Sequence, residues 1–345
     1  MPSGRFSRWR GDGNISVITS APGKMILFGE YAVLEGHEAL VLAVDRQVTT
    51  HYKPNETLVV DAPGYGRYAP AENHRTLPFI SALLDGQPAT TGEFRVSSQG
   101  FNTHDGKLGL GSSAASTVSF AAALQILKTG QIVKSDLMAT AQNAHFQVQG
   151  LGSGADIAAS CYGGALRYAW LTENETGHVF GQEIKTDLGR ACIQPLTGGF
   201  PSILAVWTGC SASTTQLVES VRRVRGQEAY ASAIKVLSEA AVQGIQGWCS
   251  ADRATLIDAM TQSTQALHLL GTAASVALVT DTHEQLARLV GTRGAVKPTG
   301  AGGGDLAWVL GTNAANDIEL AQDMTNAGYE CFTLNVCEVG ARRLP

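Results

Sequence analysis

Three glycine-rich segments carry residue types that could bind phosphate groups. The first is APGK, which ends in Lys24; the second is KLGLGSSA at 107–114; and the third is KPTGAGGGD at 297–305. Glycine lets a backbone close around an anion without a Cβ in the way, and a lysine ammonium attracts phosphate. The three segments together predict a site for a phosphate-bearing ligand.

The second segment stands directly before an apolar run at helical spacing, so it should form the N-terminus of a helix. Unsatisfied N–H groups and a partial positive charge make a helix N-terminus a good anion site. Gly109 and Gly111 allow close approach of the backbone, and the hydroxyls of Ser112 and Ser113 could bind phosphate or Mg²⁺. The alternative is a plain glycine turn with a serine cap. A Walker A pattern occurs nowhere, so this is not the usual nucleotide loop.

Composition and charge narrow the class of protein. The 345 residues are 44% hydrophobic and 16% charged, with a net charge of −5, which is typical of a globular protein and argues against nucleic acid as a partner. No run reaches about 18 apolar residues, so no membrane span is predicted. Six scattered cysteines without a CxxC pair favour free thiols in a reducing cytoplasm. We expect residues 1–14, which lack an apolar run, to be a flexible extension rather than a secretory signal.

The elements that must position these segments are a mixture of strands and helices without regular alternation. This pattern favours an α+β fold in two lobes, with APGK as a turn between two short strands. The turn-rich segment 186–200 predicts domains at 1–195 and 196–345. Strands are predicted at 15–19, 25–28, 39–53, 56–64, 92–99, 165–171, 202–209, 304–311 and 329–341. Helices are predicted at 72–86, 112–127, 134–150, within 152–164, and at 213–225, 282–291 and 314–328, and two more cover about 228–271.

The three glycine-rich segments, in this order and about 85 and 190 residues apart, resemble the three motifs of the GHMP small-molecule kinases. The resemblance covers roughly residues 19–338. It implies a two-lobed α+β fold, with a ribosomal-protein-S5-like N-terminal lobe and a ferredoxin-like C-terminal lobe. It also implies ATP and Mg²⁺ as cofactors and a small-molecule acceptor, in a monomer or homodimer.

Within that superfamily several details are most similar to the phosphomevalonate kinases. They are Tyr31 in GEYAVLEG, Lys107 before the phosphate loop, the segment AHFQVQGLGSGADIAASCYGG, WTGCSASTTQLV, and Asp305 at the end of the third motif. This branch implies transfer of a phosphoryl group from ATP to (R)-5-phosphomevalonate. Mevalonate or another alcohol is the competing acceptor, and a non-catalytic binding protein with the same fold is a further alternative. The forms of the second and third motifs disfavour a decarboxylase.

The resemblance assigns roles residue by residue. Asp156 matches the aspartate proposed as catalytic base in mevalonate kinases, although it could simply cap its helix. Lys24 would stabilise the transferred phosphoryl group. Nucleotide binding falls to Lys107, Gly109, Leu110, Gly111, Ser112, Ser113 and Ala114, and metal binding to Ser113.

One position departs from mevalonate kinases, which use a glutamate metal ligand where this chain has His145. Imidazole is a poor Mg²⁺ ligand, so a packed or hydrogen-bonded histidine competes with one that touches substrate phosphate. The other residues expected at the substrate are Tyr31, Ser153, Gly154, Ser213, Gly302, Gly303 and Asp305. Arg46, Arg167 and Arg293 are unranked candidates for binding the substrate carboxylate.

Overall fold

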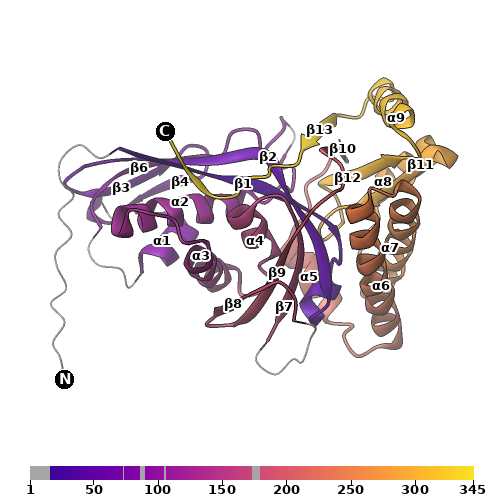
Figure 1. Ribbon diagram of the computed structural model, residues 1–345, viewed down its shortest axis with the longest axis horizontal. Helices are drawn as coiled ribbons and strands as arrows, with labels where there is room; N and C mark the ends of the chain where they lie inside the picture. The colour runs from indigo at the N-terminus through magenta and orange to yellow at the C-terminus, as the bar shows by residue number, and fades with distance from the viewer. Residues whose placement is uncertain (1–15, 73, 86–89, 105, 173–178) are drawn as a thin grey trace.

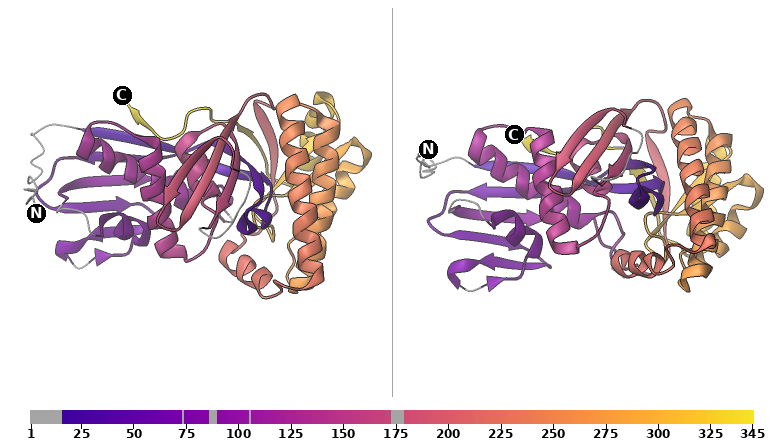
Figure 2. Two further views of the ribbon diagram at one scale, coloured as in Figure 1. Left: turned by 60° about the horizontal axis from the view of Figure 1, so that its bottom comes forward. Right: turned by 90° about the horizontal axis from the view of Figure 1, so that it is seen from below.

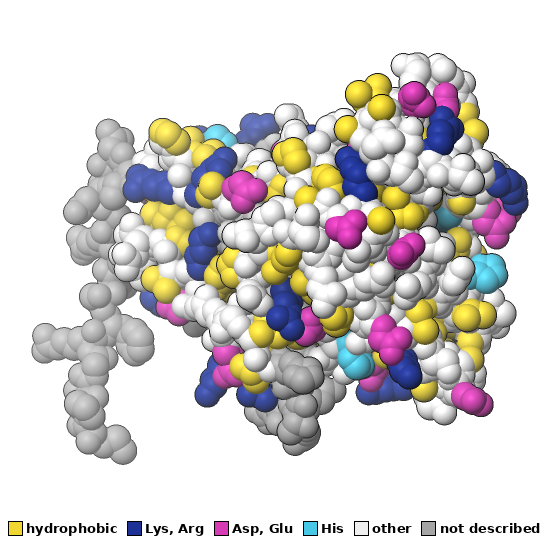
Figure 3. All heavy atoms as spheres, turned by 45° about the vertical axis from the view of Figure 1, so that its right-hand side comes forward, with side chains coloured by type: hydrophobic (Ala, Val, Ile, Leu, Met, Phe, Trp, Pro, Cys, Tyr) yellow, Lys and Arg dark blue, Asp and Glu magenta, His cyan; other side chains and the backbone are white. Residues whose placement is uncertain are grey.

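The computed structural model describes residues 16–72, 74–85, 90–104, 106–172 and 179–345, and this part of the chain forms two β-sheets with helices packed against them (Figure 1). The predicted extension at 1–14 lies outside the described residues. Among the helices of the described ranges, none has the length and apolar character needed to cross a membrane. On the face drawn in Figure 3, acidic and basic side chains are interspersed.

The first sheet is built around the long strands β1 and β2, which pair antiparallel along nearly their whole length. β2 also pairs with β6 and β7, and the short C-terminal strand β14 pairs with β1. The strands are β1 (Val17–Phe28), β2 (Glu38–Lys53), β3 (Leu58–Ala62), β4 (Gly66–Ala69), β5 (His74–Arg75), β6 (Gly92–Ser97), β7 (Ala165–Leu171), β8 (Gln182–Thr186), β9 (Gly189–Leu196) and β14 (Arg342–Leu344).

Helices cover one face of this sheet, as Figures 1 and 2 show. They are α1 (Pro78–Leu84), α2 (Ser112–Thr129), α3 (Lys134–Gln149) and α4 (Ala155–Tyr162). α2 and α4 pack directly on β1 and β2. The buried face of α2 is rich in alanine, which lets the helix lie close to the strands and holds its N-terminus beside β1. This packing brings the second glycine-rich segment to the first.

The second sheet has the order β11-β12-β10-β13, and its strands are β10 (Ser202–Trp207), β11 (Gly294–Pro298), β12 (Leu306–Gly311) and β13 (Cys331–Asn335). Its helices are α5 (Thr214–Arg222), α6 (Glu228–Ser250), α7 (Arg253–Ala274), α8 (Asp281–Val290) and α9 (Ala314–Asn326). Alternate residues of β12 face opposite layers: Ala307 and Val309 join a cluster with α8 and α9, whereas Trp308 and Leu310 join the main core. The long pair α6 and α7 closes one end of the molecule (Figure 2).

The predicted turn at APGK is wrong, because β1 runs through it as one strand. A register shift in the pairing with β2 falls between Pro22 and Gly23, where proline has no N–H to donate. A Cβ on Gly23 would lie 2.8 Å from both Leu110 O and the ring of Phe101, so only glycine fits here. Lys24 is therefore held on a strand.

Two other predicted segments also differ from the structure. The helix expected at 72–86 begins only at Pro78, because proline suits the first turn of a helix, where its missing N–H is not needed. The segment 186–200, expected to be turn-rich, contains β9. The chain leaves the first sheet after β9 and enters the second at β10, and β14 later returns to the first. The domain limits 1–195 and 196–345 remain our proposal.

His283 leads to a prediction about acid stability. It is buried in the first turn of α8, and its Nδ1 accepts a hydrogen bond from the Thr280 N–H at 3.1 Å. Burial, together with the charge of Lys297, lowers the pKa of His283 to about 4. The unfolded chain therefore takes up a proton below about pH 6.5, but the folded chain does so only near pH 4, so stability is lost as the pH falls through this window.

We expect the free energy of unfolding to drop by about 3 kcal/mol between pH 7 and pH 4 from this group, measured by urea unfolding. In His283→Gln, whose side-chain oxygen can still accept from Thr280, this component of the pH dependence should vanish. An unchanged pH profile in the variant would contradict the assignment.

Candidate active site

A cavity of about 290 Å³ lies where the three glycine-rich segments meet. Its wall comes from β1, the loop before α2, the helix α3, the start of α4, the start of α5 and the loop 299–305. Residues far apart in the chain thus share one space. The predicted site residues that line it are Lys24, Tyr31, Lys107, Gly109, Leu110, Gly111, Ser112, Ser113, His145, Ser153, Gly154, Asp156 and Asp305.

The second glycine-rich segment, residues 107–114, is called the phosphate loop below. It has the backbone shape expected for an anion site. Gly109 and Gly111 have φ angles of 73° and 74°, a region that favours glycine. Gly111 is the N-cap of α2 and offers no side-chain acceptor to the N–H groups of the first turn. The partial positive charge of this helix end therefore lies at the cavity, beside Ser112 and Ser113.

Lys24 lies against this loop. Its Nζ donates to Gly109 O at 3.1 Å, and its backbone N–H donates to Leu110 O at 2.8 Å. A Cβ on Gly111 would lie 2.9 Å from Lys24 Cγ, so the glycine leaves room for the lysine stem. β1 and the phosphate loop therefore fix one ammonium group at the place where phosphate oxygens would be bound.

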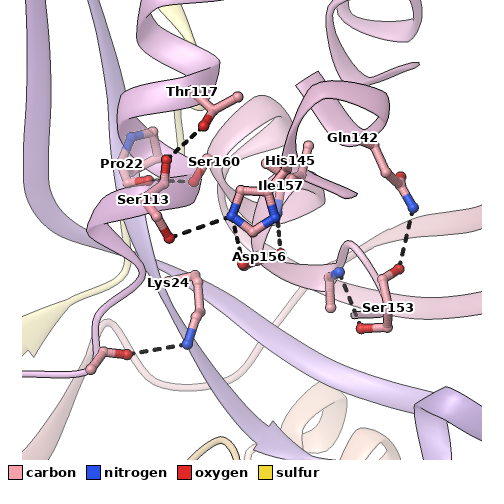
Figure 4. Close-up of polar contacts among 12 residues, drawn as sticks. Pro22, Lys24, Ser113, Thr117, Gln142, His145, Ser153, Asp156, Ile157 and Ser160 are labelled. Atoms are coloured by element: carbon pink, nitrogen blue, oxygen red, sulfur yellow. Dashed lines mark hydrogen bonds and ion pairs between the residues drawn. The ribbon is translucent and has the colours of Figure 1, made fainter. Parts of the chain in front are cut away.

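His145 stands between the serine of the phosphate loop and the aspartate of α4 (Figure 4). Its Nε2 is 3.4 Å from Ser113 Oγ and 4.0 Å from Asp156 Oδ2. Phe79 stacks on the imidazole with centroids 4.9 Å apart. Both interpretations of His145 thus have support: the ring is packed and hydrogen-bonded, and it also lines the cavity.

Asp156 sits in the first turn of α4, where its Oδ1 accepts from the Ile157 N–H at 2.9 Å. The turn before it is shaped by Gly154, because a Cβ there would lie 2.4 Å from Gln142 Nε2. Gln142 in turn donates to Ser153 O at 3.4 Å, and the buried Tyr168 hydroxyl donates to the same oxygen. These contacts fix the start of α4 and hence the place of the Asp156 carboxylate; Figure 4 shows the contact between Gln142 and Ser153.

Asp305 connects the third motif to the other two. It has a φ of 56°, unusual for a residue other than glycine, and its Oδ1 accepts from the Ala212 N–H at 3.1 Å. A Cβ on Gly109 would lie 2.4 Å from its Oδ2, so the carboxylate lies against the phosphate loop. Burial raises the pKa of Asp305, and the charges of Lys24 and Lys107 oppose that shift.

Four of the predicted site residues are not among those that line the cavity. Ala114 is fully buried inside α2, and Ser213 is the N-cap of α5, between Ala212 and Thr214, which do line it. Gly302 and Gly303 instead lie against α5 and the segment after α7, where a Cβ would come within 2.4 Å of Leu278 O and 2.7 Å of the Leu217 side chain. They shape the third motif and do not face the cavity.

The three candidate arginines also lie away from the cavity lining. Arg46 pairs with Asp45 at 3.2 Å, Arg293 pairs with Asp323 at 2.8 Å, and Arg167 pairs with Glu38. Each guanidinium forms an ion pair with a nearby carboxylate, and none of the three lines the cavity in which a substrate would bind.

Sequence reasoning missed Glu30, although it lines the cavity and is almost fully buried. Lys297 Nζ, on β11, donates to Glu30 Oε1, and the neighbouring Tyr31 hydroxyl donates to Ala301 O at 2.6 Å. These contacts join the segment directly after β1 to the third motif across about 270 residues of chain. The only sequence signal was that Glu30 directly precedes Tyr31 in GEYAVLEG.

The oxygen donors present fit Mg²⁺. In the described ranges no group of three or more His, Cys, Asp or Glu side chains could hold a metal by itself. Mg²⁺ commonly takes one or two protein oxygens and completes its shell with water and phosphate. Ser113 Oγ and the Asp156 carboxylate, both close to His145 Nε2, are donors of that kind.

Comparisons with known proteins agree with this geometry. The model of the GHMP kinases N terminal domain matches residues 100–164. A phosphomevalonate kinase of Streptomyces sp. strain CL190 is 27% identical to this chain. The match covers 94% of this chain and 96% of that protein. A mevalonate kinase of Aeropyrum pernix is also 27% identical, covering 94% and 97%.

Solved structures show the same fold. The Streptococcus pneumoniae phosphomevalonate kinase in complex with phosphomevalonate and AMPPNP superimposes with a TM-score of 0.76 at 19% identity, covering 96% of this chain and all of that one. A crystal structure of mevalonate kinase gives a TM-score of 0.69 at 19% identity, covering 93% and 99%. The predicted resemblance to GHMP kinases and the predicted two-lobed α+β fold are confirmed.

Proposed function

We propose that this chain, a GHMP kinase in fold and in sequence, transfers the γ-phosphoryl group of ATP to (R)-5-phosphomevalonate and yields mevalonate 5-diphosphate and ADP. The main observation in its support is that Lys24, the phosphate loop and Asp156 line the same cavity. Six free cysteines support a reducing, cytoplasmic setting.

A phosphate acceptor is favoured over an alcohol by the residues around the phosphate loop. Lys107 lines the cavity together with Lys24, so two ammonium groups are available to an acceptor that carries its own phosphate. The Lys107 ammonium also lies 5.8 Å from the centre of the Tyr65 ring, which holds it beside the loop. Mevalonate is the competing acceptor, because relatives at the same identity are mevalonate kinases.

The mechanism follows from where the charges lie. A phosphate acceptor has a second pKa near 6 and is largely ionised at neutral pH, so little deprotonation is required. Lys24 neutralises charge between the two phosphates, and Asp156 orients the acceptor oxygen. Ser113 and Asp156 would hold Mg²⁺, which neutralises phosphate charge when bound. The helix dipole of α2 and the phosphate loop hold the nucleotide phosphates in place.

The acceptor can be tested by a coupled assay of ADP release with mevalonate and phosphomevalonate side by side. We expect turnover with phosphomevalonate. Activity on mevalonate alone would instead make the chain a kinase for an alcohol acceptor. ATP binding by calorimetry without turnover on either compound would favour a non-catalytic role.

Asp156→Asn should lower kcat with phosphomevalonate by less than about 100-fold, because the acceptor needs orientation more than deprotonation. Asn keeps the size of the side chain and one oxygen. The measurement is kcat at saturating ATP, with the exposed Asp136→Asn in α3 as a control for loss of a carboxylate. A loss near 10⁴-fold would contradict a role of Asp156 limited to orienting the acceptor.

A further inference from the structure

A fully buried ion pair forms part of the cavity wall. Glu30 is 2% exposed and Lys297 is 0% exposed, and Lys297 Nζ donates to Glu30 Oε1 and, at 2.8 Å, to Pro298 O. Burial raises the pKa of the Glu30 carboxyl and lowers that of the Lys297 ammonium, and their mutual attraction counteracts both shifts. In other proteins, replacing a buried ion pair by apolar side chains of similar volume is often neutral or stabilising. Stability alone therefore does not account for the pair.

Only one of the two carboxylate oxygens of Glu30 is used by this pair. Glu30 Oε2 is buried and has no hydrogen-bond partner among the described residues, although Glu30 lines the cavity. A buried carboxylate oxygen without a donor is costly, so a ligand that supplies a donor at this point gains binding free energy.

Glu30 contacts the third motif and not the phosphate loop, although the charge of Lys24 is close enough to act on its carboxyl. Lys24 contacts the loop at Gly109, whereas Glu30 and Tyr31 contact Lys297 and Ala301 of the third motif. Apolar side chains line the cavity near Tyr31 and belong to the same cluster of packed residues; they are Leu34, Leu151 and Val218. This wall suits the short hydrocarbon body of an acceptor and not the nucleotide phosphates.

We propose that Glu30 Oε2 accepts a hydrogen bond from the tertiary hydroxyl group of the acceptor, with Lys297 as the positioning residue that holds the carboxylate. The inference rests on the proposed function. Phosphomevalonate carries a carboxylate, a phosphate and one hydroxyl, and a carboxylate oxygen repels the two anions. The hydroxyl is the group that can donate to it. Glu30 thereby selects for an acceptor that is hydroxylated at the branched carbon.

The experiment compares phosphomevalonate with its 3-deoxy analogue, which lacks this hydroxyl, in wild type and in Glu30→Met/Lys297→Met. The double variant removes both charges and keeps similar volumes, so the buried site stays compatible with folding. We expect wild type to prefer the hydroxylated acceptor about 10- to 100-fold in kcat/KM, and the double variant to show a ratio near 1. A purely structural role of the pair would lower both activities and leave the ratio unchanged.

Glu35→Gln is the matched control, because Glu35 lies on the same segment but pairs with Arg225 outside the cavity lining. It should keep the wild-type ratio. A folded double variant that retains the full preference would overturn the inference. Equal kcat/KM for the two acceptors in wild type would overturn it without any variant, while leaving the proposed function intact. If wild type does not turn over phosphomevalonate at all, the proposed function fails and the inference with it.

Discussion

Lys24→Met is expected to lower kcat/KM by about a hundred- to a thousandfold, as loss of a fixed charge that stabilises a transition state does in other enzymes. Lys24 is held by its hydrogen bond to Gly109 O and by the room that Gly111 leaves for its stem. Methionine keeps the aliphatic part of the side chain and removes the ammonium. The loss should therefore appear in kcat with little change in thermal stability.

The measurement is steady-state kinetics with ATP and phosphomevalonate, together with a thermal unfolding curve. Lys53→Met is the matched control, because Lys53 is an exposed lysine at the end of β2 that pairs with Glu93. It undergoes the same chemical change away from the cavity lining. Near-normal turnover of Lys24→Met would refute the role assigned to Lys24.

Lys297→Met should have the largest effect on stability, because it leaves the Glu30 carboxylate buried without its ion partner. Breaking such a pair typically costs about 3–5 kcal/mol. The pKa of Glu30 is already raised by burial, and losing Lys297 raises it further. The folded variant then binds a proton that the unfolded chain has released, so its deficit should shrink as the pH falls.

Urea unfolding of wild type, Lys297→Met and Glu30→Met/Lys297→Met at pH 7 tests this. The double variant should recover most of the lost stability, because neither charge remains. Lys235→Met removes an exposed lysine that lies 3.9 Å from Glu239 and should change stability by less than about 1 kcal/mol. A deficit in Lys297→Met no larger than this control would show that the buried pair contributes little.

Local patterns in the sequence predicted most of the elements. Apolar spacing located the helices α2 and α3, since one buried face imposes its period on the sequence, and α6, α7, α9 and the long strand β2 were also predicted. The errors fall where tertiary pairing overrides local preference. Pro22 and Gly23 read as a turn, but pairing with β2 carries β1 through them. Similarly, β9 is held by its neighbours β7 and β8 and not by its own composition.

Three of the predicted site residues that line the cavity could be found from local backbone shape. Gly109, Gly111 and Gly154 have positive φ angles at the starts of helices, and this requirement is visible in the sequence itself. The candidates that do not line the cavity were chosen by residue type or by motif position, and neither shows contacts made far along the chain. Arg167, for instance, is taken by Glu38 on a neighbouring strand, a pairing that no local pattern reveals.

The sequence by itself determined the three glycine-rich segments and their order, and hence the resemblance to GHMP kinases and the proposal of phosphate chemistry, because backbone freedom and helix ends are encoded within a few residues. Only the tertiary structure decided which side chains meet across long stretches of chain. It brought Lys297 to Glu30, Tyr31 to Ala301 and Asp305 to Gly109. Such contacts depend on how two sheets pack together. Burial then makes Glu30, which looks ordinary in the sequence GEYAVLEG, a carboxylate that requires a partner.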